Sequence, residues 1–205
     1  RAAIGFCGGS GQSCVGSSRL LVHESVREEF TRLVVEAMAS LPMGDPFDPR
    51  TMLGPLASRA HHERVAGYLQ LAQEEGGQVI GGQAEQGLFL SPALVTGLDN
   101  TSRVAREEIF GPVTALIPFT EDDEAVRIAN DTPYGLAATV FTRDVGRAHR
   151  MADRLDAGTV WVNTVNEMSS GPLPFGGFKQ SGLGREHGLD VIAAYTETKA
   201  VVVAL

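Results

Sequence analysis

The hydrophobic positions along this chain follow two different spacings. Short apolar runs have the length of buried strands, and they lie at 19–23, 78–80, 93–95, 113–119, 137–142 and 158–163. Between them, apolar residues recur every three or four positions, which predicts helices near 26–41, 58–75, 145–155 and 184–194. Strands that alternate with helices need crossover connections, so the pattern predicts an α/β fold: a largely parallel open sheet with helices on both faces.

Polar residues and glycines mark the ends of several predicted helices. Ser25 followed three residues later by Glu28 predicts a capping box. Thr120 is expected to cap the helix that follows the strand 113–119, with Asp123 in its first turn. The chain ends in an apolar run, Lys199 to Leu205, that is typical of a strand.

Composition narrows the class of protein. The chain has 205 residues, of which 43% are hydrophobic, enough to bury a core without crosslinks. A net charge of −8 argues against binding to nucleic acid or to an anionic membrane, and no apolar stretch has the length of a membrane span. With only two cysteines there is no disulfide framework, so we expect a reducing, cytoplasmic location where a thiol can stay reactive. No Cys/His cluster has metal-ligand spacing, and we expect no metal site.

The first candidate for chemistry is the loop 8–18, in which small residues surround Cys14. If Cys14 opens a helical turn, free backbone N–H groups there would stabilise its thiolate and could face an oxyanion. The alternative is a buried structural cysteine in a glycine-rich loop. Cys7 follows Ile4 and Phe6, and this apolar setting assigns it to packing.

Two further loops carry candidate binding residues. Glu107 and Glu108 are either a solvated acidic pair or a site where a carboxylate accepts hydrogen bonds from a ribose diol, with Phe110 beside it for an aromatic ring. The loop 173–186 is rich in glycine and proline, which indicates a rigid shape. Its Gly182-x-Gly184 is not a dinucleotide fingerprint, because His187 stands where the last glycine belongs. Sites in parallel sheets gather at the carboxyl ends of strands, so we expect the loops 8–18, 106–113 and 164–186 to meet in one crevice there.

Taken in order, these motifs resemble the aldehyde dehydrogenase superfamily, in its C-terminal portion. Residues 11–14 (GQSC) are similar to its nucleophile motif, with Arg19 at the expected following arginine. Residues 107–113 (EEIFGPV) match a second motif, and Pro174 to Glu186 resemble a third. Weaker matches lie between them, at 54–56, 134–137, 158–163 and 195–197.

The resemblance implies a role for each matching position. Cys14 would attack an aldehyde, the thiohemiacetal would pass a hydride to NAD or NADP, and the thioester would be hydrolysed to a carboxylic acid. Glu108 would hold the nicotinamide ribose and Phe110 would pack beside it. Ser13, Val15 and Phe175 would line the substrate pocket. The resemblance also implies a catalytic domain over 1–196 and an oligomerisation strand over 197–205 that forms a homodimer or homotetramer.

Two departures from the family's pattern and one absence qualify this interpretation. Gly9 stands where the family usually has asparagine, which predicts a looser loop. The chain starts only thirteen residues before Cys14, so the family's general-base glutamate, its oxyanion-hole asparagine and its coenzyme-binding domain are expected upstream. Neither Glu107 nor Glu167 is a substitute for that base, and we expect the 205 residues alone to be inactive. The polar segment 164–173 predicts a less aromatic substrate mouth than in some relatives.

Other functions remain open from the sequence. The thioester could be transferred to coenzyme A instead of water. A cysteine hydrolase would need one of five histidines beside Cys14: His23, His61, His62, His149 or His187. A non-catalytic module that pairs through the terminal strand is a third alternative. The sequence leaves the aldehyde and the choice between NAD and NADP undecided.

Overall fold

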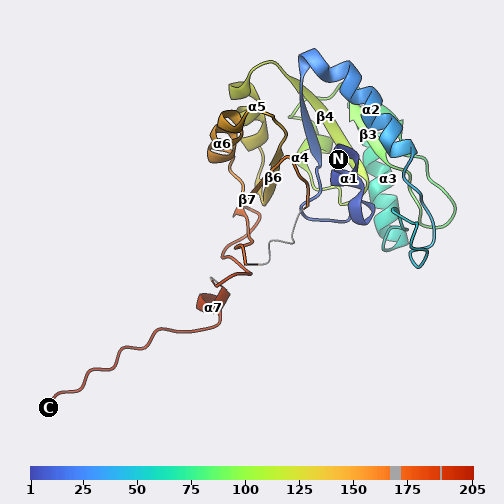
Figure 1. Ribbon diagram of the computed structural model, residues 1–205. Coiled ribbons are helices and arrows are strands. Elements are labelled where there is room, and N and C mark those ends of the chain that lie inside the picture. The colour runs from blue at the N-terminus through green and yellow to red at the C-terminus, as the bar shows by residue number, and fades with distance from the viewer. Residues whose placement is uncertain (167–171, 190) are drawn as a thin grey trace.

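The computed structural model describes residues 1–166, 172–189 and 191–205 (Figure 1). The elements follow one another in the order α1 (Ala2–Cys7), η1 (Gly8–Gly11), β1 (Arg19–His23), η2 (Glu24–Val26), α2 (Arg27–Ala39), α3 (Arg59–Glu74), β2 (Gln78–Gly81), β3 (Ala93–Thr96), α4 (Arg103–Arg106), β4 (Val113–Phe119), α5 (Asp122–Asn130), β5 (Tyr134–Gly135), β6 (Ala137–Val140), α6 (Val145–Arg154), β7 (Thr159–Val162), β8 (Phe178–Lys179) and α7 (Val191–Ala194).

The main sheet has four strands in the order β1-β4-β3-β2. β4 pairs in parallel with both β1 and β3, and β2 is antiparallel at the edge. β6 and β7 form a parallel pair, and β5 and β8 an antiparallel pair. The predicted α/β fold with a largely parallel open sheet is therefore confirmed.

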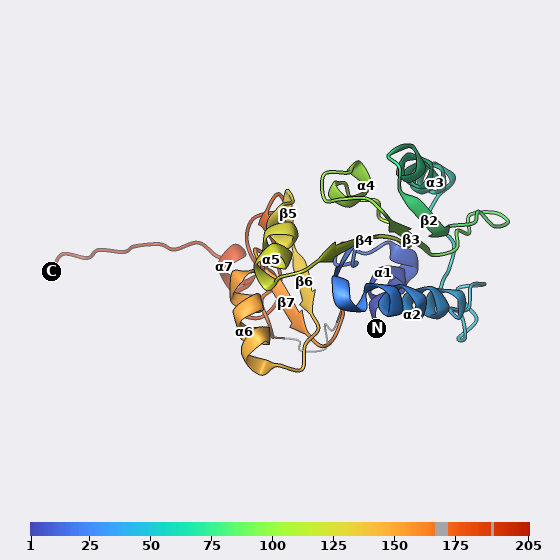
Figure 2. The same cartoon turned by 90° about the horizontal axis from the view of Figure 1, so that it is seen from above.

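Helices cover both faces of the main sheet, as the view from above in Figure 2 shows. α1 and α2 lie on one face, and α3 and α4 on the other. Side chains of β3 alternate between the two cores, since successive residues of a strand point to opposite faces. Leu94 packs with Phe6, Cys7 and Val34, whereas Ala93 and Val95 pack with the α3 side chains Val65, Leu69 and Ala72.

The structure corrects two predicted helix caps. Ser25 lies inside η2, where its hydroxyl is hydrogen-bonded to Nδ1 of His23 at 2.8 Å, and α2 begins at Arg27. Thr120 does not cap α5, because Glu121 holds the N-cap position. The N–H and the hydroxyl of Thr120 instead donate to the Glu124 carboxylate. Short polar side chains can form hydrogen bonds with several nearby groups. Here Ser25 binds His23 and Thr120 binds Glu124, and neither caps the predicted helix.

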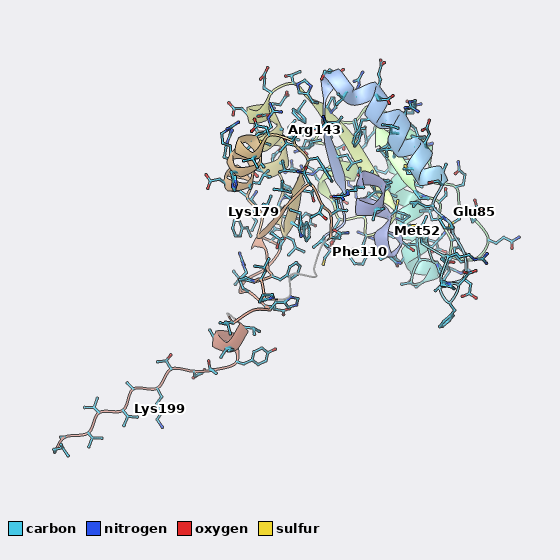
Figure 3. All side chains as sticks on the ribbon, viewed as in Figure 1. Met52, Glu85, Phe110, Arg143, Lys179 and Lys199 are labelled. Carbon is cyan, nitrogen blue, oxygen red and sulfur yellow. The ribbon has the colours of Figure 1, made fainter. Side chains whose placement is uncertain are left out.

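The end of the chain also differs from prediction. The helix expected over 184–194 shrinks to α7, and residues 195–205 are exposed, with no strand assigned. Figure 3 shows Lys199 on an extended tail that points away from the rest of the molecule. A strand needs a neighbour for its backbone groups, and none of the described residues pairs with this tail. No helix in the described residues is long and apolar enough to cross a membrane.

Candidate active site

Cys14 lies at the corner of a tight turn. The carbonyl of Ser13 accepts a hydrogen bond from the N–H of Gly16 at 3.0 Å, which leaves Cys14 and Val15 at the tip. Cys14 is exposed, and its neighbours Ser13 and Val15 are half-buried. Cys14 does not open a helix, because α1 ends at Cys7, an irregular 3-10 segment runs to Gly11, and Cys14 lies in the turn that follows. Within the described residues the Cys14 N–H has no hydrogen-bond acceptor.

The turn leads directly into the main sheet. The hydroxyl of Thr114 donates to the carbonyl of Ser17 at 2.8 Å, and the N–H of Ala115 donates to that of Ser18 at 3.0 Å. β1 begins at the next residue, Arg19, and runs parallel to β4. The loops 8–18 and 106–113 therefore lie at the amino ends of β1 and β4. We expected the carboxyl ends, which was wrong because both loops enter their strands instead of leaving them.

The nucleophile loop and the Glu108 loop are in backbone contact. A Cβ atom on Gly11 would lie 2.1 Å from both the carbonyl carbon and the carbonyl oxygen of Gly111. Only glycine allows two backbones to approach this closely. Phe110 precedes this contact, and Figure 3 shows it at the lower end of the main body of the molecule in that view. Two of the three loops that we expected to meet are thus brought together.

A third segment, residues 54–57, fixes the same loop from another side. The Ser10 hydroxyl donates to the Gly54 carbonyl at 2.9 Å, and the Gln12 side-chain oxygen accepts from the Ala57 N–H at 2.8 Å. On the side of residues 54–57, both partners are backbone groups, the Gly54 carbonyl and the Ala57 N–H. These hydrogen bonds therefore depend on the course of the backbone there. The two polar residues of the nucleophile loop that precede Ser13 are therefore used to hold the loop in place.

The two adjacent glutamates have different environments. Glu107 is bound by Arg103 at 2.7 Å and by the Tyr68 hydroxyl at 2.7 Å, and the Arg103 hydrogen bond, followed by that of Tyr68, lowers the pKa of its carboxyl. Glu108 is exposed, and no partner for its carboxylate lies among the described residues. Phe110 has a positive φ of 60° and is 37% exposed. Glu108 and Phe110 thus present a free carboxylate and an open ring, which fit a ribose diol and the ring next to it.

The third motif, Pro174 to Glu186, packs against a different part of the fold from the Cys14 turn. Phe175 and Glu186 exchange two backbone hydrogen bonds, and the Phe175 ring stacks on His187 at 5.8 Å between centroids. A Cβ atom on Gly158 would lie 1.7 Å from the carbonyl oxygen of Gly176, so this loop packs against the start of β7. No contact in the described part of the chain joins Phe175 to the Cys14 turn.

Among the described residues, the beginning of the 164–186 loop lies near α1 and the start of the nucleophile loop. A Cβ atom on Gly5 would lie 3.5 Å from Cγ1 of Val165, and one on Gly8 would lie 4.0 Å from the side-chain nitrogen of Asn166. Glu167 and the following residues up to 171 lie outside the described residues. The structure therefore does not place the whole predicted crevice.

Comparison with known proteins decides the family. The model of the aldehyde dehydrogenase family matches residues 1–201. This chain belongs to the aldehyde dehydrogenase family. It is 42% identical over 98% of its length to a betaine aldehyde dehydrogenase of Mesorhizobium japonicum, and it spans 43% of that protein.

Solved aldehyde dehydrogenases share the fold. An indole-3-acetaldehyde dehydrogenase of P. syringae, in complex with NAD+ and IAA, superposes with a TM-score of 0.94 and 39% identity over 100% of this chain and 42% of its own. The aldehyde dehydrogenase KauB of Pseudomonas aeruginosa gives a TM-score of 0.93 and 42% identity, over 98% of this chain and 41% of its own. The chain thus spans about 43% of the length of the relatives it matches.

Backbone geometry explains the glycine at the position where this family usually has asparagine. Gly9 has φ 59° and ψ 31°, a left-handed conformation. Asparagine adopts this region more readily than other residues with a side chain. A Cβ atom on Gly9 would meet nothing within 4 Å. Both residue types therefore suit this backbone conformation.

Within the described residues, neither Cys7 nor any of the five histidines is hydrogen-bonded to Cys14. Cys7 is buried in the core between α1 and the sheet, and this burial raises its pKa to about 12. None of the five imidazoles contacts Cys14 in the described residues; for example, His62 is hydrogen-bonded to the Phe89 carbonyl and His23 to Ser25. This arrangement does not support a cysteine hydrolase, which needs a Cys–His pair.

Sequence reasoning missed residues that hold the Glu108 loop. His61 and Arg64, both on α3, are hydrogen-bonded to backbone carbonyls of residues 108–110. Their only sequence signal is that they are three apart and so share one helix face. That spacing does not say which loop the face contacts.

Proposed function

We propose that this chain supplies the nucleophile and the nicotinamide side of an aldehyde dehydrogenase, which oxidises an aldehyde to a carboxylic acid with NAD or NADP. One observation carries the proposal: the exposed Cys14 turn is packed, through Gly11 and Gly111, against the segment that presents Glu108 and Phe110. A thiol and a ribose-binding carboxylate are thereby held on neighbouring loops at one edge of the sheet.

Cys14 starts the reaction. Its thiolate attacks the aldehyde carbon, a C–S bond forms, and the carbonyl π electrons move to oxygen. The backbone N–H of Cys14, which has no acceptor among the described residues, would donate to this oxyanion. NAD+ or NADP+, if held by Glu108 and Phe110, would accept the hydride from the thiohemiacetal carbon; with loss of the hydroxyl proton, a thioester to Cys14 would remain. Water then attacks the thioester carbon, the C–S bond breaks, and Cys14 recovers its thiolate as the acid leaves.

The neighbouring residues bind and orient. Glu108 accepts hydrogen bonds from the nicotinamide ribose hydroxyls, and Phe110 packs beside that ribose and ring. Ser13 and Val15, on either side of the nucleophile, line the substrate pocket, and Phe175 contributes from the third loop. The complexes with NAD+ among the structural relatives support NAD as the cofactor.

We do not propose Glu107 as the base that activates the hydrolytic water. Its carboxylate is hydrogen-bonded to Arg103 and Tyr68, and these contacts lower its pKa, which makes it a poorer base. We propose that a group outside residues 1–205 supplies this base.

We also propose that residues 197–205 are an oligomerisation strand, separate from a catalytic domain over 1–196. The tail is extended and exposed, and it contains the apolar residues Val201, Val202, Val203 and Leu205. A second copy of the chain would give its backbone groups the neighbour that they lack. The expected assembly is a homodimer or homotetramer.

The relatives do not narrow the substrate. One is called a betaine aldehyde dehydrogenase and another an indole-3-acetaldehyde dehydrogenase, at 42% and 39% identity. These two aldehydes differ in charge and in aromatic character. A panel that includes both is therefore the appropriate starting point.

The test uses the intact protein with that panel, NAD+ or NADP+, and product analysis with and without coenzyme A. We expect NADH or NADPH to form together with a free carboxylic acid, and Cys14→Ala to abolish this activity while Cys7→Ala retains most of it. Equal losses in the two variants would contradict the assignment of the nucleophile. A product that is an acyl-coenzyme A instead of the acid would replace hydrolysis by acyl transfer.

A further inference from the structure

One face of α3 holds the backbone of the Glu108 loop. His61, Arg64 and Tyr68 stand at positions i, i+3 and i+7 of this helix, so their side chains project from the same face. All three contact residues 107–110. These three side chains are called the α3 clamp below.

The α3 clamp forms a hydrogen bond with each residue from 107 to 110. The Arg64 guanidinium donates from its two terminal nitrogens to the carbonyls of Glu108 and Ile109. Nε2 of His61 lies 2.7 Å from the carbonyl oxygen of Phe110, which requires this nitrogen to be the donor. The Tyr68 hydroxyl donates to the Glu107 carboxylate at 2.7 Å. Four consecutive residues are therefore held by one helix.

The loop has a conformation that needs such support. Phe110 has φ 60°, a left-handed conformation that costs a residue with a side chain about 1–2 kcal/mol. Strained backbone of this kind persists only where its surroundings hold it. Packing supplies part of the hold, since a Cβ on Gly111 would lie 2.6 Å from Cγ1 of Val65 on the same helix.

The clamp leaves the binding groups of the loop free. It uses the main-chain carbonyls of 108–110 and the side chain of Glu107, whereas the Glu108 carboxylate has no partner among the described residues and the Phe110 ring stays partly exposed. The His61 ring meets the Phe110 ring at 6.2 Å in an edge arrangement, which limits where that ring can turn. The clamp thus sets the direction of both side chains without occupying them.

We propose that His61, Arg64 and Tyr68 are positioning residues that set the affinity for the nicotinamide cofactor by fixing the backbone of residues 107–110. The proposal rests on the proposed function, in which Glu108 and Phe110 bind the nicotinamide ribose. The nucleophile loop packs on Gly111 but also has hydrogen bonds of its own, those of Ser10 and Gln12 with residues 54–57. Loss of the clamp therefore affects cofactor binding more than the intrinsic reactivity of the thiol.

The experiment measures NADH binding to the intact protein by fluorescence, in a Cys14→Ala background that removes the chemistry. Arg64→Ala is expected to weaken binding about tenfold, the equivalent of about 1.4 kcal/mol. Arg64→Lys is expected to recover only part of the affinity, because one ammonium replaces a planar pair of donors. His61→Gln keeps an N–H donor and is expected to bind more tightly than His61→Leu.

A matched control lies on the same helix. Gln70 is hydrogen-bonded only to Glu74 in the described residues, on the exposed side, so Gln70→Ala should bind NADH like its parent. With Cys14 restored, Arg64→Ala should raise the KM for NAD+ about tenfold and change the KM for aldehyde less than twofold. Thermal unfolding of every variant is recorded in parallel.

The outcomes separate the two proposals. If the parent neither binds NADH nor oxidises any aldehyde, the proposed function fails. If the parent is active and Arg64→Ala and His61→Leu bind NADH as tightly as Gln70→Ala, the clamp is overturned. It is also overturned if His61→Gln and Arg64→Lys lose as much affinity as the truncations, or if the losses only track a lowered melting temperature.

Discussion

Gly11 and Gly111 are packed backbone against backbone: a Cβ atom on Gly11 would lie 2.1 Å from the carbonyl oxygen of Gly111. The contact joins the loop that carries Cys14 to the loop that carries Glu108 and Phe110. Gly11 also has φ 70°, a conformation that side chains disfavour. Two independent physical reasons therefore require glycine at this position.

The first prediction concerns this contact. Gly11→Ala should abolish most dehydrogenase activity of the intact protein and lower its free energy of unfolding by about 3 kcal/mol or more, from overpacking and strain together. Gly9→Ala is the matched control, because Gly9 has a similar φ of 59° but open space around its Cβ position. It should cost only about 1–2 kcal/mol, and Gly9→Asn less. Urea unfolding gives both values, and equal costs for Gly11→Ala and Gly9→Ala would exclude the proposed backbone contact.

The two cysteines should differ in reactivity. Cys14 is exposed at the tip of a turn, whereas Cys7 is buried and its pKa is raised to about 12. Iodoacetamide should therefore alkylate Cys14 of the folded protein at neutral pH and leave Cys7 unmodified, because the thiolate is the nucleophile. Peptide mass spectrometry identifies the modified residue. Alkylation of Cys7 at a similar rate in the folded state would contradict this burial.

Burial of Cys7 should also make the fold sensitive to alkali. Its pKa is about 12 in the folded chain against an ordinary value of 9.0, so the unfolded chain loses this proton first as the pH rises. Below pH 9 the Cys7 thiol is protonated in both states and its contribution to the free energy of unfolding is fully present. Between pH 9 and 12 the free energy of unfolding should fall by about 1.4 kcal/mol per pH unit. Cys7→Ala should show a shallower decline above pH 9 in urea unfolding. An identical slope in the parent and the variant would contradict the prediction.

Arg19 should stabilise the fold through a buried hydrogen-bond network. Its guanidinium donates to Asn100 at 2.6 Å and to the carbonyls of Ile128 and Ala129 at the end of α5, and burial lowers its pKa. Arg19→Met removes these donors and leaves the acceptors unpaired, which should lower the free energy of unfolding by about 1–3 kcal/mol.

The control for Arg19 is Arg143, which is exposed and labelled in Figure 3. Arg143→Met should change the free energy of unfolding by less than about 0.5 kcal/mol. Both variants are measured by urea unfolding at neutral pH. Similar values for the two would show that the Arg19 contacts add no net stability.

Removal of residues 197–205 should change the assembly. The tail is exposed and apolar, and its backbone finds no partner strand in the described chain. Deletion in the intact protein should shift sedimentation toward a smaller species and leave the core fold intact, since the tail lies outside the three core clusters. An unchanged sedimentation coefficient, corrected for the lost mass, would exclude these residues as the oligomer contact.

The sequence by itself determined the longer strands and helices, because hydrophobic spacing is a local signal. It did not predict the short elements α1, α4, β5 and β8. β1, β4 and α3 lie where the pattern predicts them, and Ser58 caps α3 through the His61 N–H. The motifs around Cys14 and Glu108 were also sufficient to indicate the family. Cys7 was assigned to packing from its apolar neighbours, and it is buried.

Only the tertiary structure decided where these motifs meet. Parallel pairing of β1 with β4 puts the Cys14 and Glu108 loops at the amino ends of their strands, and pairing depends on residues far apart in the sequence. The α3 clamp has the same origin, since spacing shows that His61 and Arg64 share a face but not what that face contacts. The tail 197–205 has the composition of a strand but forms none. A strand must pair with another strand, and none of the described residues pairs with this tail.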